Sequence, residues 1–151
     1  MSTPPRTADV ERDSEPAAEV VELDHAECLR LLAATSLGRL AVNVEGWPPV
    51  IRPVNYVFDE SSQSLVFRSA RGSKLTALLL STEAAFEIDG IEPEAKTGWS
   101  VIVIGAAEEI TQAAEIARLG QLGLRPLAPG DKPHWIRIRS TMVSGRRIEA
   151  V

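Results

Sequence analysis

The sequence predicts a small antiparallel β-barrel with helices packed on its outside. Short segments of alternating apolar and polar residues recur along the chain, and polar or proline-containing turns separate them. A few helical segments interrupt this series. About seven strands and three helices can be counted, and strands in hairpin order with inserted helices favour a barrel.

Length and composition are those of one globular domain, with 151 residues of which 44% are hydrophobic and 25% are charged. A chain of this length can bury enough surface to fold without a disulfide or a structural metal. Its net charge of -5 argues against a general nucleic-acid binder, which needs a basic stripe. The longest apolar run, residues 101–107, is far shorter than the roughly 20 residues of a membrane helix. We therefore expect neither a nucleic-acid partner nor a membrane span.

Cysteine usage and the N-terminus indicate where the protein works. The single cysteine, Cys28, cannot form an internal disulfide, and no Cys/His cluster has the spacing of a zinc site. The N-terminus is polar and acidic, without the apolar segment of a signal peptide. We therefore expect a cytoplasmic protein with no metal site.

The first 20 residues are rich in Pro, Ser, Thr, Glu and Ala and show no apolar period. This composition predicts a disordered N-terminal arm over residues 1–20, followed by the folded domain over residues 21–151. The alternative is an arm that packs on a second subunit.

The first helix is expected to begin at Asp24, a good N-cap residue that is followed by Glu27 in a capping-box-like pattern. Cys28, Leu31 and Leu32 share its apolar face. Three strands then form a meander. They cover residues 37–44, 50–58 and 64–69.

A second helix is expected from Lys74 to about Leu80, with Ser73 as its cap. Its buried side carries Leu75, Leu78 and Leu79. The remaining expected elements are a strand at 84–89, a loop at 90–97, a long strand that ends at 110, a helix at 111–120, and strands at 134–139 and 142–148.

Arg52 is the odd member of an otherwise apolar and aromatic row. Alternate side chains of a strand share a face, so Arg52 should point the same way as Val54 and Tyr56. An arginine in such a row is either an edge residue that reaches water or a ligand for a buried anion. Arg68 at the end of the next strand favours the second interpretation.

Ser73 and Lys74 strengthen the case for an anion site, because they open a helix whose dipole and free N–H groups attract negative charge. Gly72 lets the backbone come close to a ligand. A Gly-Ser-Lys triplet alone is a weak signal, since it also describes a well-capped helix. Together these residues predict that the stretch from Ile51 to Lys74 holds the phosphate of a flavin-type cofactor.

Trp99 lies between Gly98 and Ser100 at the entrance of a strand. The indole can offer a flat face to a ring, while its neighbours supply donors to the ring edge. A tryptophan of the core or of a dimer interface is the alternative. His134 and Trp135 could line a substrate pocket or pack in an interface, and Arg146 could reach a neighbouring subunit's cofactor or remain a surface charge.

No catalytic residue can be assigned. The sequence shows no Ser-His-Asp order, no carboxylate pair and no metal cluster. A cofactor that carries the chemistry itself accounts for this, because the protein then supplies only binding and orientation.

On these residues the chain resembles the pyridoxamine 5'-phosphate oxidase-like family of FMN-binding split barrels, over about residues 23–148. The resemblance rests on the order and spacing of segments 49–56, 66–69, 72–75, 86–89, 98–101 and 145–148. It implies a mainly β (α+β) fold, a six- to eight-stranded antiparallel split β-barrel with flanking helices. It also implies a homodimer with a cofactor at each end of its interface.

The resemblance further implies roles for particular residues. Arg52 and Lys74 would grip the phosphate, with Ser73 and either Arg68 or Ser69 beside them. Main-chain groups of Val54 and Asn55 would meet the ring edge, with Trp99 and Ser100 close by from the adjoining wall or subunit. The complete expected set of cofactor-binding residues is Arg52, Pro53, Val54, Asn55, Phe67, Arg68, Ser69, Ser73, Lys74, Trp99 and Ser100.

Members of this family use FMN or a deazaflavin coenzyme, and some branches bind haem. True pyridoxamine phosphate oxidases carry a lysine where this chain has Val57 and an Arg-x-His motif near the C-terminus, where this chain has Arg146-Arg147-Ile148. The sequence is closer to the small bacterial branch of nitroimidazole-resistance-type and deazaflavin-dependent reductases.

We therefore expect a homodimeric FMN-binding oxidoreductase that passes hydride or electrons to a small organic acceptor. The alternatives are a deazaflavin-dependent reductase, a non-enzymatic flavin- or haem-binding module, and a cofactor-free dimer.

Overall fold

The computed structural model of the chain describes residues 18–126 and 129–150, and the side chains of Ser73 and Lys74 lie outside that description. The described part holds eight strands and three helices. They are β1 (Ala18–Glu22), α1 (His25–Ala34), β2 (Leu37–Val42), β3 (Val50–Asn55), β4 (Val57–Asp59), β5 (Ser64–Ser69), α2 (Ser73–Leu80), β6 (Ala84–Glu92), β7 (Thr97–Ile110), α3 (Ala113–Gly120) and β8 (His134–Ala150).

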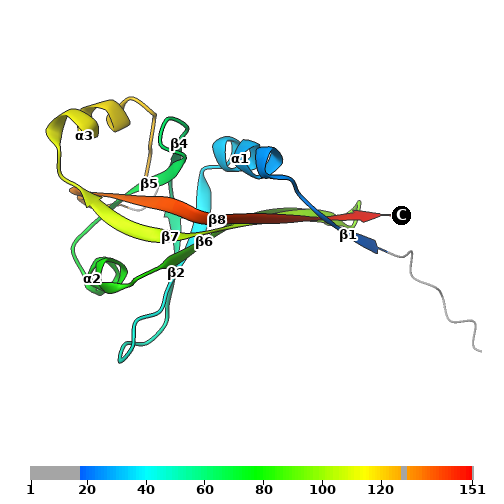
Figure 1. Cartoon of the computed structure of the whole chain (residues 1–151), viewed down its shortest axis with the longest axis horizontal. Coiled ribbons are helices and arrows are strands. Elements are labelled where there is room, and N and C mark those ends of the chain that lie inside the picture. Colours follow the sequence, from blue (N-terminus) through cyan, green and yellow to red (C-terminus); the bar gives the residue numbers. More distant parts are fainter. Residues whose placement is uncertain (1–17, 127–128, 151) are drawn as a thin grey trace, which may run out of the picture.

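All eight strands belong to one antiparallel sheet. Its order is β3-β2-β6-β7-β8-β5-β4, and β1 pairs separately with β8. The strands at the two ends of this order, β3 and β4, are separated in the chain by Tyr56 alone. The chain therefore carries the sheet round on itself into a half-barrel with three helices about it, which confirms the predicted split-barrel fold (Figure 1).

Tyr56 marks the point where the sheet is split. The sequence predicted one strand over residues 50–58, but the backbone N–H of Tyr56 donates to the Ser36 carbonyl at 3.0 Å instead of to a ladder. Its hydroxyl donates to the Leu32 carbonyl at 2.7 Å, and its ring meets Phe86 edge-on with centroids 5.0 Å apart. Tyr56 is only 1% exposed, so this residue ties the split to the end of α1 and to the core.

The first helix agrees with the prediction from its residues. The Asp24 side chain accepts a hydrogen bond from the Glu27 N–H at 2.8 Å, and α1 follows. Cys28, Leu31 and Leu32 are buried on its inner face. The capping box is incomplete, because the Glu27 carboxylate pairs with Arg30.

The main core fills the inside of the barrel. Inward side chains of β2, β5, β6, β7 and β8 meet the buried faces of α1 and α2 there. A smaller cluster of Val66, Ile110 and Leu119 lies on the other side of the sheet, under α3. Strand β5 is therefore buried on both faces, with Leu65 and Phe67 in the main core and Val66 under α3.

Beyond the barrel, parts of β6, β7, β8 and β1 continue as a long ribbon (Figure 1). The loop predicted at 90–97 is shorter than expected, because β6 runs to Glu92 and β7 begins at Thr97, which leaves residues 93–96 as the turn. The two last strands predicted from the sequence are one strand, β8, with an irregularity in its pairing to β7 beside Gly105. The described chain is already in a strand at Ala18, inside the predicted arm of residues 1–20, while residues 1–17 lie outside the described residues.

A buried ion network fastens α3 to the barrel. Asp59 is 2% exposed and accepts from Arg118 at 3.1 and 2.7 Å. Arg137, which is 5% exposed, lies 3.4 Å from the Asp59 carboxylate and donates to Glu115 at 2.6 Å. The hydrogen bond from Arg118 is the main reason why the pKa of Asp59 lies well below its usual range and why that of Glu115 falls to about 2.

Replacing Asp59 by Asn should lower the free energy of unfolding by about 3 kcal/mol at pH 7, because it leaves the buried Arg137 guanidinium undercompensated. The folded-state pKa of Asp59 is depressed, so its contribution is complete above an unfolded pKa of about 3.9 and disappears as pH falls below it. Urea unfolding should therefore show the difference between wild type and D59N shrinking from pH 6 to pH 3. Glu108→Gln, at an exposed ion pair with Arg139, is the matched control and should change little. An equal difference at both pH values would contradict the role given to Asp59.

Candidate functional site

The N-terminus of α2 is open to an anion. Gly72 occupies the N-cap position, one residue before the cap predicted at Ser73, and the helix itself begins at Ser73. Gly72 has no side chain that could cap this end, and the first turn contains no acidic residue. Because the first N–H groups of a helix have no partner within it, this end presents backbone donors and the positive end of the helix dipole.

Gly72 is required here for its backbone conformation. Its φ of 153° and ψ of -178° fall in a region that is essentially limited to glycine. A Cβ at this position would meet nothing within 4 Å, so space is not the constraint. The glycine therefore sets the direction in which the chain leaves β5 and enters α2.

Arg52 lies on β3 opposite Leu40, in the row that also contains the buried Val54. Its own side chain is exposed, and Nη1 donates to the neighbouring Ile51 carbonyl at 2.8 Å. Among the described residues it has no carboxylate partner. Its positive charge is therefore available to a ligand.

Arg68 and Ser69, the two alternatives for a residue beside the phosphate, point to opposite faces at the end of β5. Ser69 is buried on the inner face, where its hydroxyl donates to the Ala70 carbonyl at 2.9 Å. Arg68 points to the opposite face, where Nε donates to the Lys132 carbonyl at 2.8 Å and the guanidinium lies 5.2 Å from the centre of the Trp135 ring. Phe67 is fully buried, so its side chain serves the core. Ser69 is thus the better placed of the pair to face a ligand on the inner side, the side of Arg52.

His134 pairs with Ser69 across the β5–β8 ladder. Its Nδ1 contacts the Glu109 carboxylate, which fixes the orientation of the ring. Its Nε2 is buried and has no hydrogen-bond partner among the described residues. The sequence left the role of His134 open, and the structure places it next to the expected phosphate site.

Asn55 lies where β3 ends, and its side-chain amide is 3.5 Å from the Ser36 carbonyl. Beside it, Pro53 is exposed and Val54 is buried. A cavity of about 500 Å³ opens at Asn55, between the end of α1 and the chain after α3. Its lining residues are Ala33, Ala34, Thr35, Ser36, Asn55, Tyr56, Val57, Phe58, Leu122, Gly123 and Arg125. Sequence reasoning missed Arg125, because a lone arginine in a Pro/Gly-containing loop carries no local signal.

Trp99 and Ser100 lie apart from this group, on the ribbon. The indole of Trp99 lies across Gly90, where an added Cβ would come within 2.6 Å of its Nε1. Both residues line a second cavity, of about 310 Å³. Across the sheet, Arg52 pairs with Leu40, Leu40 with Phe86, and Phe86 with Val103. Ser100 is three residues farther along β7, so strand spacings put it about 17 Å from Arg52 along the sheet.

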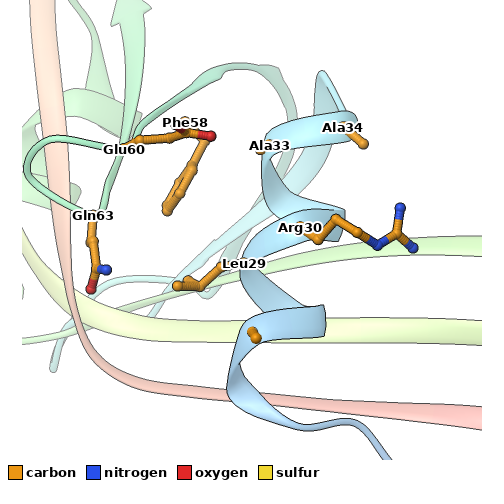
Figure 2. A pocket seen from close by; sticks show the side chains of 8 residues that line it. Leu29, Arg30, Ala33, Ala34, Phe58, Glu60 and Gln63 are labelled. Atoms are coloured by element: carbon orange, nitrogen blue, oxygen red, sulfur yellow. The ribbon is translucent and has the colours of Figure 1, made fainter.

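A third cavity lies beside α1. It measures about 620 Å³ and lies between α1 and the turn that joins β4 to β5. Figure 2 shows Leu29 and Phe58 pointing into it, while the Arg30 guanidinium points away. None of the predicted cofactor-binding residues lines it. This cavity forms where a helix lies opposite a turn that is distant in sequence, so no local sequence pattern predicts it.

Two kinds of feature are absent from the described part of the chain. Residues 18–126 and 129–150 contain no group of three or more His, Cys, Asp or Glu side chains arranged to hold a metal ion. Over the same residues, no helix has the length and apolar character needed to cross a membrane.

Replacing Gly72 by Ala should cost about 1 to 3 kcal/mol of stability, because alanine is strained at this φ and ψ. Gly120→Ala is the control with the same chemical change, since Gly120 lies in α3 with a negative φ and open space around its Cα. That control should be neutral or slightly stabilising. Urea unfolding of the two variants provides the comparison, and equal stabilities would argue against a glycine-specific conformation at residue 72.

Comparison with known proteins identifies the family of this chain. A family model described as pyridoxamine 5'-phosphate oxidase matches residues 24–147. An uncharacterised protein of Mycobacterium tuberculosis is 34% identical over 139 residues, which cover 89% of each chain. A Corynebacterium glutamicum structure, named as a candidate pyridoxamine 5'-phosphate oxidase, is 32% identical with a TM-score of 0.75 and covers 87% of this chain and 95% of that one. The FAD-binding protein of Mycobacterium smegmatis is 31% identical with a TM-score of 0.72, over 87% of this chain and 100% of that chain. This chain therefore belongs to the pyridoxamine 5'-phosphate oxidase family and has its split-barrel fold.

Proposed function

We propose that the protein binds a flavin, FMN in the first instance, where β3, β5 and α2 meet. It would act as an oxidoreductase that passes hydride or electrons to a small organic acceptor. The observation that carries this proposal is the N-terminus of α2, where the N-cap is a glycine without a capping side chain and the first turn contains no acidic residue. Such an end suits a phosphate dianion. The FAD-binding relative from M. smegmatis supports a flavin as the source of that phosphate.

The residues where β3, β5 and α2 meet have the chemistry needed to bind the flavin phosphate. The guanidinium of Arg52 is exposed and has no carboxylate partner among the described residues, so it can bind phosphate oxygens in a fork. Lys74 would add a compact positive charge from the first turn of α2. Ser69 lies on the inner face and would offer its hydroxyl beside them.

The remaining residues would orient the ring. Main-chain groups of Val54 and Asn55 would hydrogen-bond its edge, and the walls of the cavity beside Asn55 would exclude water from one side. A bound flavin supplies the redox chemistry through its ring, which is consistent with the lack of an assigned catalytic residue. The protein would therefore contribute binding, orientation and exclusion of water.

We further propose that the protein is a homodimer that pairs through the outer face of its sheet. An apolar row crosses five strands there, because the ladder registers align Ile51, Ala41, Ala85, Ile104 and Met142 side by side. Ile51 is 64% exposed and Met142 is 58% exposed, which is unusual for large apolar side chains in one continuous row.

Beside this row lie charged residues that pair with one another. Arg39 lies 3.1 Å from Glu87 and 2.5 Å from Asp89 on the same outer face. A surface of this kind can meet a second copy about a two-fold axis with Arg39 already paired to carboxylates of its own chain. Such pairing would also bring the ribbon of one subunit, with Trp99 and Ser100, toward the site on the other. Trp99 and Ser100 lie far from Arg52 within one chain, and this pairing would bring them close to the Arg52 of the other subunit.

The double replacement of Arg52 and Lys74 by Ala should weaken FMN binding by a factor of at least about 100, because two charge-assisted contacts to the phosphate are lost. Quenching of FMN fluorescence on titration measures this. Riboflavin, which lacks the phosphate, should bind the variant and the wild type alike. Arg139→Ala with Lys96→Ala removes the same charges elsewhere and should leave FMN affinity unchanged. Wild-type affinity for FMN in the Arg52/Lys74 variant would show that the phosphate lies elsewhere.

The identity of the cofactor is tested by a thermal-shift panel of FMN, FAD, a deazaflavin and haem. A ligand at 100 times its dissociation constant should stabilise the fold by about 2.7 kcal/mol. We expect FMN or FAD to give the largest shift, with FAD favoured if this chain follows its M. smegmatis relative. A shift with haem alone would replace the flavin proposal, and no shift with any member would favour a protein that works without these cofactors.

Met142→Glu should convert the dimer to a monomer, because it places a charge in the middle of the apolar row. Sedimentation velocity measures the change, and flavin affinity should fall with it if the site is shared between subunits. Leu80→Glu is the control, since Leu80 is 60% exposed on α2, which packs against the inner face of the sheet. A monomeric wild type, or a dimeric M142E, would rule out this interface.

A further inference from the structure

The cavity of about 500 Å³ beside Asn55 has features that the proposed flavin site does not use. Three parts of the chain that are distant in sequence enclose it: the end of α1, the β3–β4 junction, and residues 122–125 after α3. Its size falls within the range of small-molecule sites, about 300 to 1,000 Å³. Asn55 lines the cavity, and its main chain is expected to meet the edge of the flavin ring. A ligand in the cavity would therefore lie next to that ring.

The charge of the cavity is positive and uncompensated. Arg125 is the only charged residue among its described lining residues, and it has no ion pair or hydrogen bond within the described chain. Arg30 in the neighbouring 620 Å³ cavity differs, because Glu27 pairs with it at 2.6 Å. An exposed guanidinium that lines a cavity without a carboxylate favours an anionic ligand.

The end of α1 forms one wall of the cavity, and one carbonyl of its last turn is engaged within the chain. Carbonyl groups at a helix C-terminus repel anions when they have no partner. Here the Leu32 carbonyl accepts from the Tyr56 hydroxyl at 2.7 Å, and the Ser36 carbonyl accepts from the Tyr56 N–H at 3.0 Å. One carbonyl behind this wall, that of Leu32, and one of a lining residue, Ser36, are therefore engaged, and the hydroxyl-bearing residues Thr35 and Ser36 line the cavity.

The rest of the wall is apolar. Val57, Phe58 and Leu122 line the cavity together with two alanines of α1. A ligand that matches this wall has a compact apolar or aromatic body in addition to its negative group.

We propose that this cavity is the binding site for the organic acceptor and that the acceptor is a small carboxylate with an apolar or aromatic body, held through its carboxylate by Arg125. The assignment of the ligand as the acceptor rests on the proposed function. The anion site itself rests only on the cavity and on Arg125.

Benzoate is a suitable probe, with benzamide as a neutral molecule of the same shape. In the full-length protein, isothermal titration should show benzoate binding in about the millimolar range, as expected for so small a ligand. Benzamide should bind at least about 10-fold more weakly, because it lacks the charge that Arg125 recognises.

Arg125→Gln should reduce benzoate affinity at least about 10-fold, and Arg125→Lys should recover part of it, because lysine restores the charge without the fork. Arg139→Gln, which removes a guanidinium of the exposed pair with Glu108, is the control and should bind benzoate as wild type does. Equal benzoate affinity in wild type and R125Q, or equal affinity of wild type for benzoate and benzamide, would overturn the anion site.

A second readout separates this inference from the flavin proposal. In flavin-loaded protein, benzoate should perturb the visible absorption of the flavin in wild type and not in R125Q at the same concentration. Benzoate binding that depends on Arg125 but leaves the flavin spectrum unchanged would overturn the assignment of the ligand as the acceptor. Benzoate binding by a protein that takes up no flavin would sustain the anion site while the proposed function fails.

Discussion

The continuity of the chain from Val50 to Asp59 is the constraint on which the rest of the structure depends. This segment supplies both ends of the sheet order, so the sheet must curl for β3 and β4 to be consecutive. Tyr56 holds the turning point through hydrogen bonds to Leu32 and Ser36 and an edge-on contact with Phe86. Arg52 and Asn55 precede this point and Asp59 follows it, so the candidate site and the ion network under α3 are both positioned by the same buried tyrosine.

Ion pairing in this molecule distinguishes arginines that stabilise the fold from arginines whose charge is available to a ligand. Arg118 and Arg137 are neutralised by Asp59 and Glu115 where α3 joins the barrel. Arg52 and Arg125, by contrast, have no carboxylate partner within the described chain, and each lies beside a feature that could hold an anion. Because a charge left near the surface without a partner adds little to stability, such positions are informative about ligands.

Local patterns predicted those parts of the fold whose interactions are themselves local. The cap at Asp24 and the buried face of α1 depend on residues three or four apart, and both are present. Residues 90–97 look like a loop because glycine and charged residues interrupt the apolar pattern, yet half of them pair in a hairpin. Gly90 is needed there because Trp99 crosses it, and that contact is visible only once the two strands are paired.

The sequence by itself determined the family, the antiparallel barrel and the group of basic and hydroxyl residues around β3, β5 and α2. The family was reached through a resemblance in the order and spacing of several segments, whereas the barrel and the basic group follow from alternation, turn chemistry and helix caps, which act over a few residues. Tertiary structure alone decided that Arg68 stacks on Trp135, that Ser69 faces inward, and that Arg125 and Asn55 line one cavity. Such outcomes depend on which surfaces meet when the sheet closes, and the closure joins residues that no short stretch of sequence connects.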